Sequence, residues 1–126
     1  PWGQIHYRVV ASARSGSRLP LVCLHASPLS GIVYDEWLQE IGRDRLALAP
    51  DTPGYGASAT PPRPPSIGDY ADAMRQFLDG LGLGEVDLMG YHTGSLTSIE
   101  LARRLPARVR HVVLISAPIF TPAELE

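Results

Sequence analysis

Residues 86–102 read VDLMGYHTGSLTSIELA and place a histidine at the centre of a sharp change of pattern. A short apolar run typical of a strand leads into GYHTG, and a spacing typical of a helix follows. A tight turn from strand to helix strains its central residue and lifts that side chain above the sheet. Such a turn needs small residues two positions either side, and Gly90 and Gly94 supply them around His92. Because imidazole titrates near neutral pH, His92 could serve as a general base or a nucleophile.

Two backbone amides are candidates to stabilise negative charge beside this histidine. Thr93 directly follows His92, so its N–H is expected at a helix N-terminus, where developing negative charge is favoured. A second amide in such sites comes from the loop that follows an earlier strand. Residues 25–28 (HASP) form that loop here, and we choose Ser27 as the donor. Together these residues predict an oxyanion hole.

Short apolar runs alternate along the chain with helical patterns. We expect strands over residues 4–10, 19–24, 45–49, 86–89 and 111–116, and helices over residues 30–41, 66–83 and 94–105. Ser66 and Asp69 have the spacing of a capping box at the start of the second helix. This order predicts an α/β fold with a mostly parallel sheet and flanking helices. Ligands bind such sheets at the carboxyl ends of the strands, where four turn-rich segments should meet: residues 25–28, 51–58, 90–94 and 117–119.

Composition narrows the classes of function. The 126 residues carry a net charge of −2, which gives no reason to expect binding to nucleic acid or to a membrane surface. All 11 basic residues are arginine, a bias we attribute to high-GC, bacterial coding. Cys23 is the only cysteine; we expect a buried, inert thiol, no metal site and no cofactor. With no apolar run of membrane-spanning length and no visible signal peptide, we expect a cytoplasmic protein.

Taken together, the motifs resemble the first half of an α/β-hydrolase-fold protein. The resemblance rests on GQIHYRV (3–9), LVCLHASP (21–28), APDTPGYGAS (49–58), SIGDYADAMRQFLDGLGL (66–83), DLMGYHTG (87–94) and HVVLISAP (111–118). It implies that the amides of Ser27 and Thr93 form the oxyanion hole. It also implies that the loop of His25 supports this site and that Asp51 opens a structural loop beside it.

The sequence departs from the family's pattern in three ways. The family holds Ser, Asp or Cys at the position of His92, and it has His-Gly where this chain has His25-Ala26. Its catalytic acid and histidine follow strands later than residues 111–116, and its first strand precedes residue 3. We therefore interpret residues 1–126 as the N-terminal portion of a single α/β-hydrolase-like domain, from a longer protein or a truncated gene product. In isolation, residues 111–116 would form an exposed apolar edge strand.

These observations favour a hydrolase-like enzyme acting on a small carbonyl or ester-type substrate. His92 is the candidate catalytic residue, as nucleophile or base, although an inert histidine in a binding site is an alternative. A non-catalytic ligand-binding protein of the same fold, or a lyase or cofactor-free oxygenase, is therefore a competing hypothesis. Ser95 lies one residue past the turn, so its hydroxyl should not reach the central position. The sequence predicts neither the substrate nor the oligomeric state.

Overall fold

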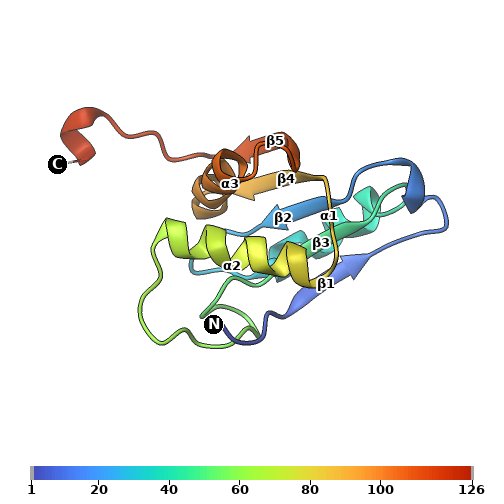
Figure 1. The fold of residues 1–126 in the computed structure, drawn as a ribbon, viewed down its shortest axis with the longest axis horizontal. Helices are drawn as coiled ribbons and strands as arrows, with labels where there is room; N and C mark the ends of the chain where they lie inside the picture. Colours follow the sequence, from blue (N-terminus) through green and yellow to red (C-terminus); the bar gives the residue numbers. More distant parts are fainter. Residues whose placement is uncertain (1, 126) are drawn as a thin grey trace.

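The computed structural model describes residues 2–125 and contains a five-stranded sheet in the order β1-β3-β2-β4-β5. The strands are β1 (Tyr7–Val10), β2 (Leu21–Leu24), β3 (Ala47–Pro50), β4 (Val86–Tyr91) and β5 (Val109–Ile115). All neighbouring pairs are parallel except β1 and β3, which are antiparallel. Figure 1 shows β2, β4 and β5 running in the same direction. The predicted α/β class with a mostly parallel sheet is thus confirmed.

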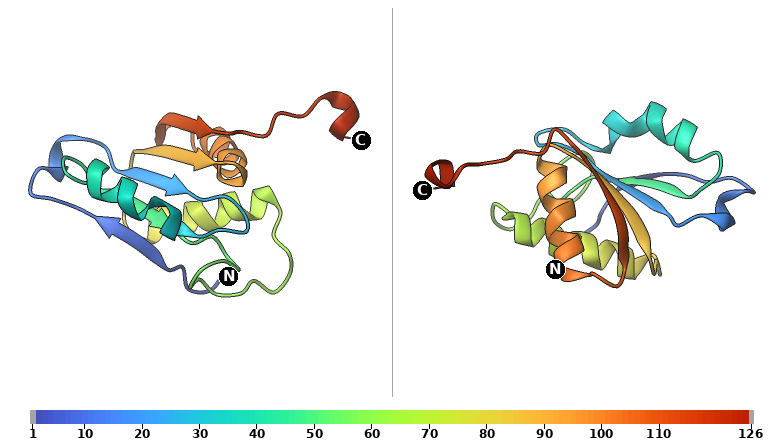
Figure 2. Two further views of the ribbon diagram at one scale, coloured as in Figure 1. Left: turned by 180° about the vertical axis from the view of Figure 1, so that it is seen from behind. Right: turned by 90° about the horizontal axis from the view of Figure 1, so that it is seen from above.

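Within residues 2–125, three α-helices pack on the two faces of this sheet. They are α1 (Asp35–Ile41), α2 (Ile67–Gly80) and α3 (Thr93–Arg104), with short 3-10 turns η1 (Ser15–Ser17), η2 (Gly31–Tyr34) and η3 (Pro122–Leu125). Figure 2 shows α2 and α3 on one face and α1 on the other. The single helix predicted over residues 30–41 is divided into η2 and α1. Its first turn is a 3-10 turn, capped by the Ser30 side chain, which accepts a hydrogen bond from the amide of Ile32.

The start of α2 has the capping box that the sequence predicts. The Ser66 hydroxyl accepts a hydrogen bond from the Asp69 amide, and the Asp69 carboxylate accepts one from the Ser66 amide. Arg63 adds an ion pair to Asp69, with 2.7 Å between nitrogen and oxygen. The capping box fixes the residue at which α2 begins, and the apolar face of the helix is turned toward the sheet. That face supplies Met74, Phe77 and Leu78 to the core.

The core has two layers, separated by the sheet. Along β2, Val22 and Leu24 pack with the buried residues of α2 and α3, whereas Leu21 and Cys23 pack with those of α1. Alternate side chains of a strand point to opposite faces, so a strand covered on both faces reads as a continuous apolar run. Cys23 is fully buried, and burial raises its thiol pKa to about 12. This agrees with the prediction of an inert thiol.

The edge strand β5 differs from β2 in its exposure. The side chains of Val113, Leu114 and Ile115 are 47%, 43% and 40% exposed. The exposed apolar edge predicted from the sequence is therefore present in the described part of the chain. Within residues 2–125, no helix combines the length and the apolar character needed to cross a membrane.

Candidate functional site

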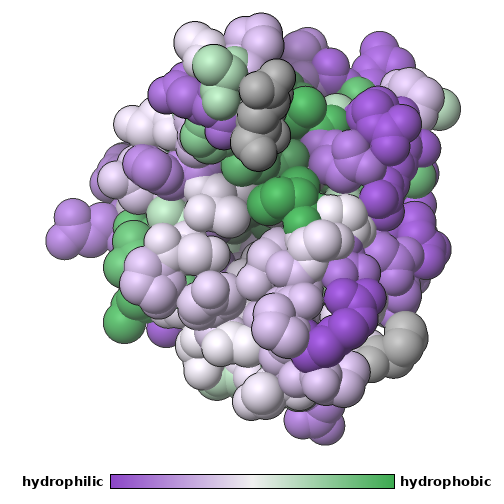
Figure 3. Space-filling model, turned by 90° about the vertical axis from the view of Figure 1, so that its left-hand side faces the viewer, coloured by the Kyte–Doolittle hydropathy of each residue, from purple (hydrophilic) through white to green (hydrophobic). Residues whose placement is uncertain are grey.

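The loops that could hold a site emerge together at one edge of the sheet. Leu24 at the end of β2 pairs with Gly90 of β4, and Gly90 in turn pairs with Leu114 of β5. The segments after these strands therefore lie side by side, as expected for parallel strands. Figure 3 looks onto this edge, where hydrophobic residues form a patch surrounded by a mostly weakly polar surface.

The turn between β4 and α3 is strained at its central residue. His92 has φ 56° and ψ −113°, a conformation that side-chain-bearing residues rarely adopt. A Cβ on Gly90 would overlap the backbone of Gly94, and a Cβ on Gly94 would overlap the carbonyl of Leu24. Both glycines are thus required by close backbone contacts, which is the physical reason for the pattern GYHTG.

The imidazole of His92 is exposed at this turn. Its ring lies edge-on to the ring of Tyr91, with 5.9 Å between centroids. Within residues 2–125 no side chain or backbone group forms a hydrogen bond to either ring nitrogen. The backbone amide, by contrast, donates to the carbonyl of Ile115 over 2.9 Å and so anchors the turn to β5. Both imidazole nitrogens are therefore available to a ligand.

The two predicted oxyanion donors lie next to each other. Thr93 is the first residue of α3, so its backbone N–H has no partner inside the helix. The amide of Ser27 points toward the same residue and donates to the Thr93 hydroxyl over 3.4 Å. The structure thus brings Ser27, His92 and Thr93 together from segments that are 65 residues or more apart in the sequence.

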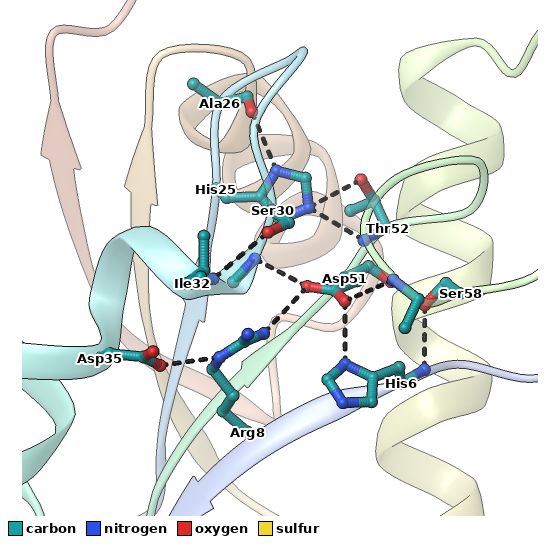
Figure 4. A network of polar contacts seen from close by, with 12 residues as sticks. His6, Arg8, His25, Ala26, Ser30, Ile32, Asp35, Asp51, Thr52 and Ser58 are labelled. Carbon is teal, nitrogen blue, oxygen red and sulfur yellow. Dashed lines mark hydrogen bonds and ion pairs between the residues drawn. The ribbon is translucent and has the colours of Figure 1, made fainter.

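His25 follows β2 but is inside the protein rather than at its surface. The side chain is only 2% exposed, and Nδ1 lies 2.9 Å from the carbonyl of Ala26, to which it donates. Nε2 accepts a hydrogen bond from the amide of Thr52 over 3.0 Å. Burial lowers the pKa of His25 below its ordinary value, which favours this neutral, doubly bonded form. His25 therefore joins the loop after β2 to the loop after β3, as Figure 4 shows.

Asp51 is the centre of a second set of contacts in the same region. Its carboxylate accepts hydrogen bonds from the amides of Gly31 and Ala57 over 2.7 and 3.0 Å, and from Nδ1 of His6 over 2.9 Å (Figure 4). Burial alone would raise the pKa of Asp51, but these hydrogen bonds outweigh it and hold the pKa below its usual value. Arg8 adds a longer ion pair at 3.6 Å. Asp51 thus orders three segments.

The partners of Asp51 include residues that sequence reasoning did not assign. Asp51 binds His6 and Arg8 of the N-terminal segment, and it forms no hydrogen bond with His25. Nothing in the local pattern around residues 6–8 points to this contact, because His6 lies 45 positions away from Asp51. The antiparallel pairing of β1 with β3 brings them together.

Ser95 does not compete with His92 for the central position. It is fully buried, and its hydroxyl donates to the carbonyl of Gly90 over 2.9 Å and approaches that of Ile115 at 3.2 Å. This agrees with the expectation that the Ser95 hydroxyl does not reach the central position of the turn. Among residues 2–125, no group of three His, Cys, Asp or Glu side chains has an arrangement suited to a metal ion.

Known proteins match this chain over most of its length. Residues 20–126 match the family described as alpha/beta hydrolase fold. A proline iminopeptidase from Clostridium botulinum is 35% identical over 77% of the chain and 34% of its own length. A 2-hydroxy-6-oxo-2,4-heptadienoate hydrolase from Pseudomonas putida is 32% identical over 81% of the chain and 38% of its own length.

Solved structures give the same result at the level of the fold. The N-acyl homoserine lactonase AidH, in complex with N-butanoyl homoserine, superposes with a TM-score of 0.82 and 31% identity. That match covers 92% of this chain and 42% of the lactonase. A Thermogutta terrifontis esterase, at 21% identity, superposes with a TM-score of 0.84 over 94% of this chain and 43% of its own. This chain therefore spans less than half the length of these proteins.

Proposed function

Since the chain belongs to the alpha/beta hydrolase fold family, we propose that it is a hydrolase in which His92 is the reacting group, and that its substrate is a small carbonyl or ester-type compound. One observation carries the proposal: an exposed imidazole on a strained turn, beside the amides of Ser27 and Thr93. Strain of this kind persists where the surrounding structure enforces it, and it is concentrated at functional sites. The hydrolases similar to this chain support the same reaction class.

The proposed role of His92 is that of a nucleophile. The lone pair of a neutral imidazole nitrogen attacks the carbonyl carbon, and a C–N bond forms while the C=O π electrons move to the oxygen. The amides of Ser27 and Thr93 donate hydrogen bonds to that oxyanion. When the C=O bond re-forms, the C–O bond to the leaving group breaks. The alkoxide takes up, through water, the proton of the other ring nitrogen, which leaves a neutral acyl-imidazole. Water then hydrolyses the acyl-imidazole, which releases the acid and restores His92.

Attack by nitrogen is compatible with the contacts of His92. A serine nucleophile needs a neighbouring base to remove its proton, whereas a neutral imidazole attacks with a lone pair it already has. No described residue accepts or donates a hydrogen bond at the imidazole of His92. The nucleophilic role requires no such partner. The alternative role, in which His92 acts as a general base on water, is distinguished from it by experiment.

The test is turnover of short-chain esters and lactones by wild-type protein, His92→Ala and His111→Ala. His111 is a matched control because its side chain is 78% exposed and lies on β5, paired with Asp87. We expect His92→Ala to lose turnover by at least about 10³-fold and His111→Ala to retain it. Acid quenching should trap an acyl group on the peptide that contains residue 92, visible by mass spectrometry. Turnover without a trapped acyl group would assign His92 as a base; full activity in His92→Ala would refute the catalytic role.

A non-catalytic binding protein is the second candidate. The observation in its favour is that no described carboxylate contacts the imidazole of His92, so nothing in residues 2–125 orients it as in a relay. Ligand-induced shifts in melting temperature, measured beside product analysis, separate the two functions. Stabilisation by esters or lactones without product favours the binding protein. A product formed by elimination or oxygen insertion would instead indicate the lyase or cofactor-free oxygenase expected as an alternative from the sequence.

A further inference from the structure

The side-chain hydroxyl of Thr93 lies next to the backbone amide of Ser27, one of the two proposed oxyanion donors. The amide of Ser27 donates to Thr93 Oγ1 at 3.4 Å, which is near the upper limit of a hydrogen bond. Ser27 is exposed and Thr93 is half-buried, so this bond is reached by water and is easily exchanged. The hydroxyl oxygen therefore stands in front of the same amide that would bind a substrate oxyanion.

A hydroxyl in this place has two capacities. It accepts a hydrogen bond from Ser27 in the resting protein, and it carries a proton that it can donate. Its residue also supplies the backbone N–H at the start of α3. A ligand oxygen that takes over the Ser27 amide must therefore come close to both donors of Thr93, since all three groups are adjacent.

We propose that Thr93 contributes its side-chain hydroxyl as a third oxyanion donor, in addition to its backbone amide. In the resting protein, the hydroxyl keeps the Ser27 amide directed at the site. When an oxyanion binds, Ser27 transfers its hydrogen bond to the oxyanion and the Thr93 hydroxyl rotates to donate to it. The inference rests on the proposed function, because it assigns Thr93 within the same site.

The geometry of α3 supports a specific role for this threonine. Gly94, the next residue, packs so closely against the end of β2 that even a Cβ would overlap the Leu24 carbonyl. That contact fixes the first turn of α3 against the loop that contains Ser27. The distance between the Thr93 hydroxyl and the Ser27 amide is thus set by backbone packing, which is the condition for a preorganised donor.

The test compares Thr93→Val, which removes the hydroxyl at nearly constant shape, with Thr93→Ser, which keeps it. Thr97→Val is a matched control, because Thr97 lies one turn further along α3 and its hydroxyl donates to the carbonyl of Thr93. The probe is methylphosphonate, a tetrahedral oxyanion, and binding is followed through the amide NMR signals of Ser27 and Thr93. We expect about tenfold weaker binding in Thr93→Val and near-wild-type binding in Thr93→Ser and Thr97→Val.

Turnover provides the second readout. Removal of the hydroxyl should lower kcat for an ester about 10- to 100-fold with little change in KM, because the donor acts on charge that develops in the transition state. Equal or tighter phosphonate binding by Thr93→Val would overturn the role of the hydroxyl, and so would an absence of binding by wild-type protein. If Thr93→Val weakens binding but His92→Ala retains turnover, the chemistry proposed for His92 fails while the donor role of Thr93 stands.

Discussion

Two histidines follow neighbouring parallel strands at the same edge of the sheet, yet their environments are opposite. His25, after β2, is 2% exposed and uses both ring nitrogens in hydrogen bonds to Ala26 and Thr52. His92, after β4, is exposed, has a positive φ and has no hydrogen bond to its ring within residues 2–125. Both occupy a position where an α/β sheet places functional groups. Position at the edge therefore does not decide the role of a side chain.

The difference lies in how each side chain meets its surroundings. The fold stabilises His25 in one neutral tautomer, and the hydrogen bonds of His25 hold two loops together. Both ring nitrogens of His25 are therefore already bonded within the protein. At His92 the backbone is held in a costly conformation and the ring gains nothing in return from a hydrogen bond. A group that is strained but unpaired is available for a ligand, whereas a group that is relaxed and fully paired is part of the scaffold.

The strongest way to sharpen this comparison is to remove each imidazole in turn. His25→Ala leaves the buried amide of Thr52 without an acceptor and opens a cavity, so we expect a loss of about 2–4 kcal/mol in the free energy of unfolding. His92→Ala should change stability by less than about 0.5 kcal/mol, because the exposed ring makes no hydrogen bond. Urea denaturation of both variants measures the two effects. Equal losses would show that the ring of His92 is structural after all.

A second substitution at residue 92 tests the backbone strain of the turn rather than the role of the imidazole. Glycine adopts positive φ without the clash of a Cβ, so His92→Gly should stabilise the protein by about 1 kcal/mol relative to His92→Ala. Thermal and urea unfolding report the change. No gain would indicate that the turn relaxes when the imidazole is removed, and the contrast between a strained and a relaxed histidine would then be lost.

The smallest expected effect is on the pH dependence of stability. Burial holds the pKa of folded His25 below its ordinary value of 6.5, so the unfolded chain binds more protons than the folded one just below that pH. The contribution of His25 is therefore complete above pH 6.5 and is lost as the pH falls through its folded pKa. We expect His92→Ala to retain this decline and His25→Asn to reduce it, measured as unfolding free energy at pH 7.5, 6.5 and 5.5. An unchanged slope in His25→Asn would contradict this linkage.

Local patterns predicted most of the elements and the turn that carries His92. The capping residues of α2 and the two glycines of the turn are recognisable because their effects act within a few positions of the chain. The extent of β1 was predicted less well: the strand covers Tyr7–Val10 rather than residues 4–10. Its length is set by pairing with β3, a partner about 40 residues away. The helix expected over residues 30–41 begins instead as a 3-10 turn.

Some features of the candidate site were also predictable from the sequence, and others were not. That Ser27, His92 and Thr93 would meet followed from the rule that parallel strands end at one edge. The hydrogen bond between the Ser27 amide and the Thr93 hydroxyl was not predictable, because it depends on how closely α3 approaches the end of β2. The binding of Asp51 to His6 likewise depends on the pairing of β1 with β3.

By itself, the sequence determined the class of fold, the order of its elements and the placement of a histidine on a strained turn. These features arise from apolar periodicity and from backbone sterics, which are encoded over short distances along the chain. Only the tertiary structure decided that His25 is buried and paired while His92 is exposed and unpaired. Burial and hydrogen bonding depend on which distant segments come into contact, and those contacts exist only once the sheet and its helices have packed together.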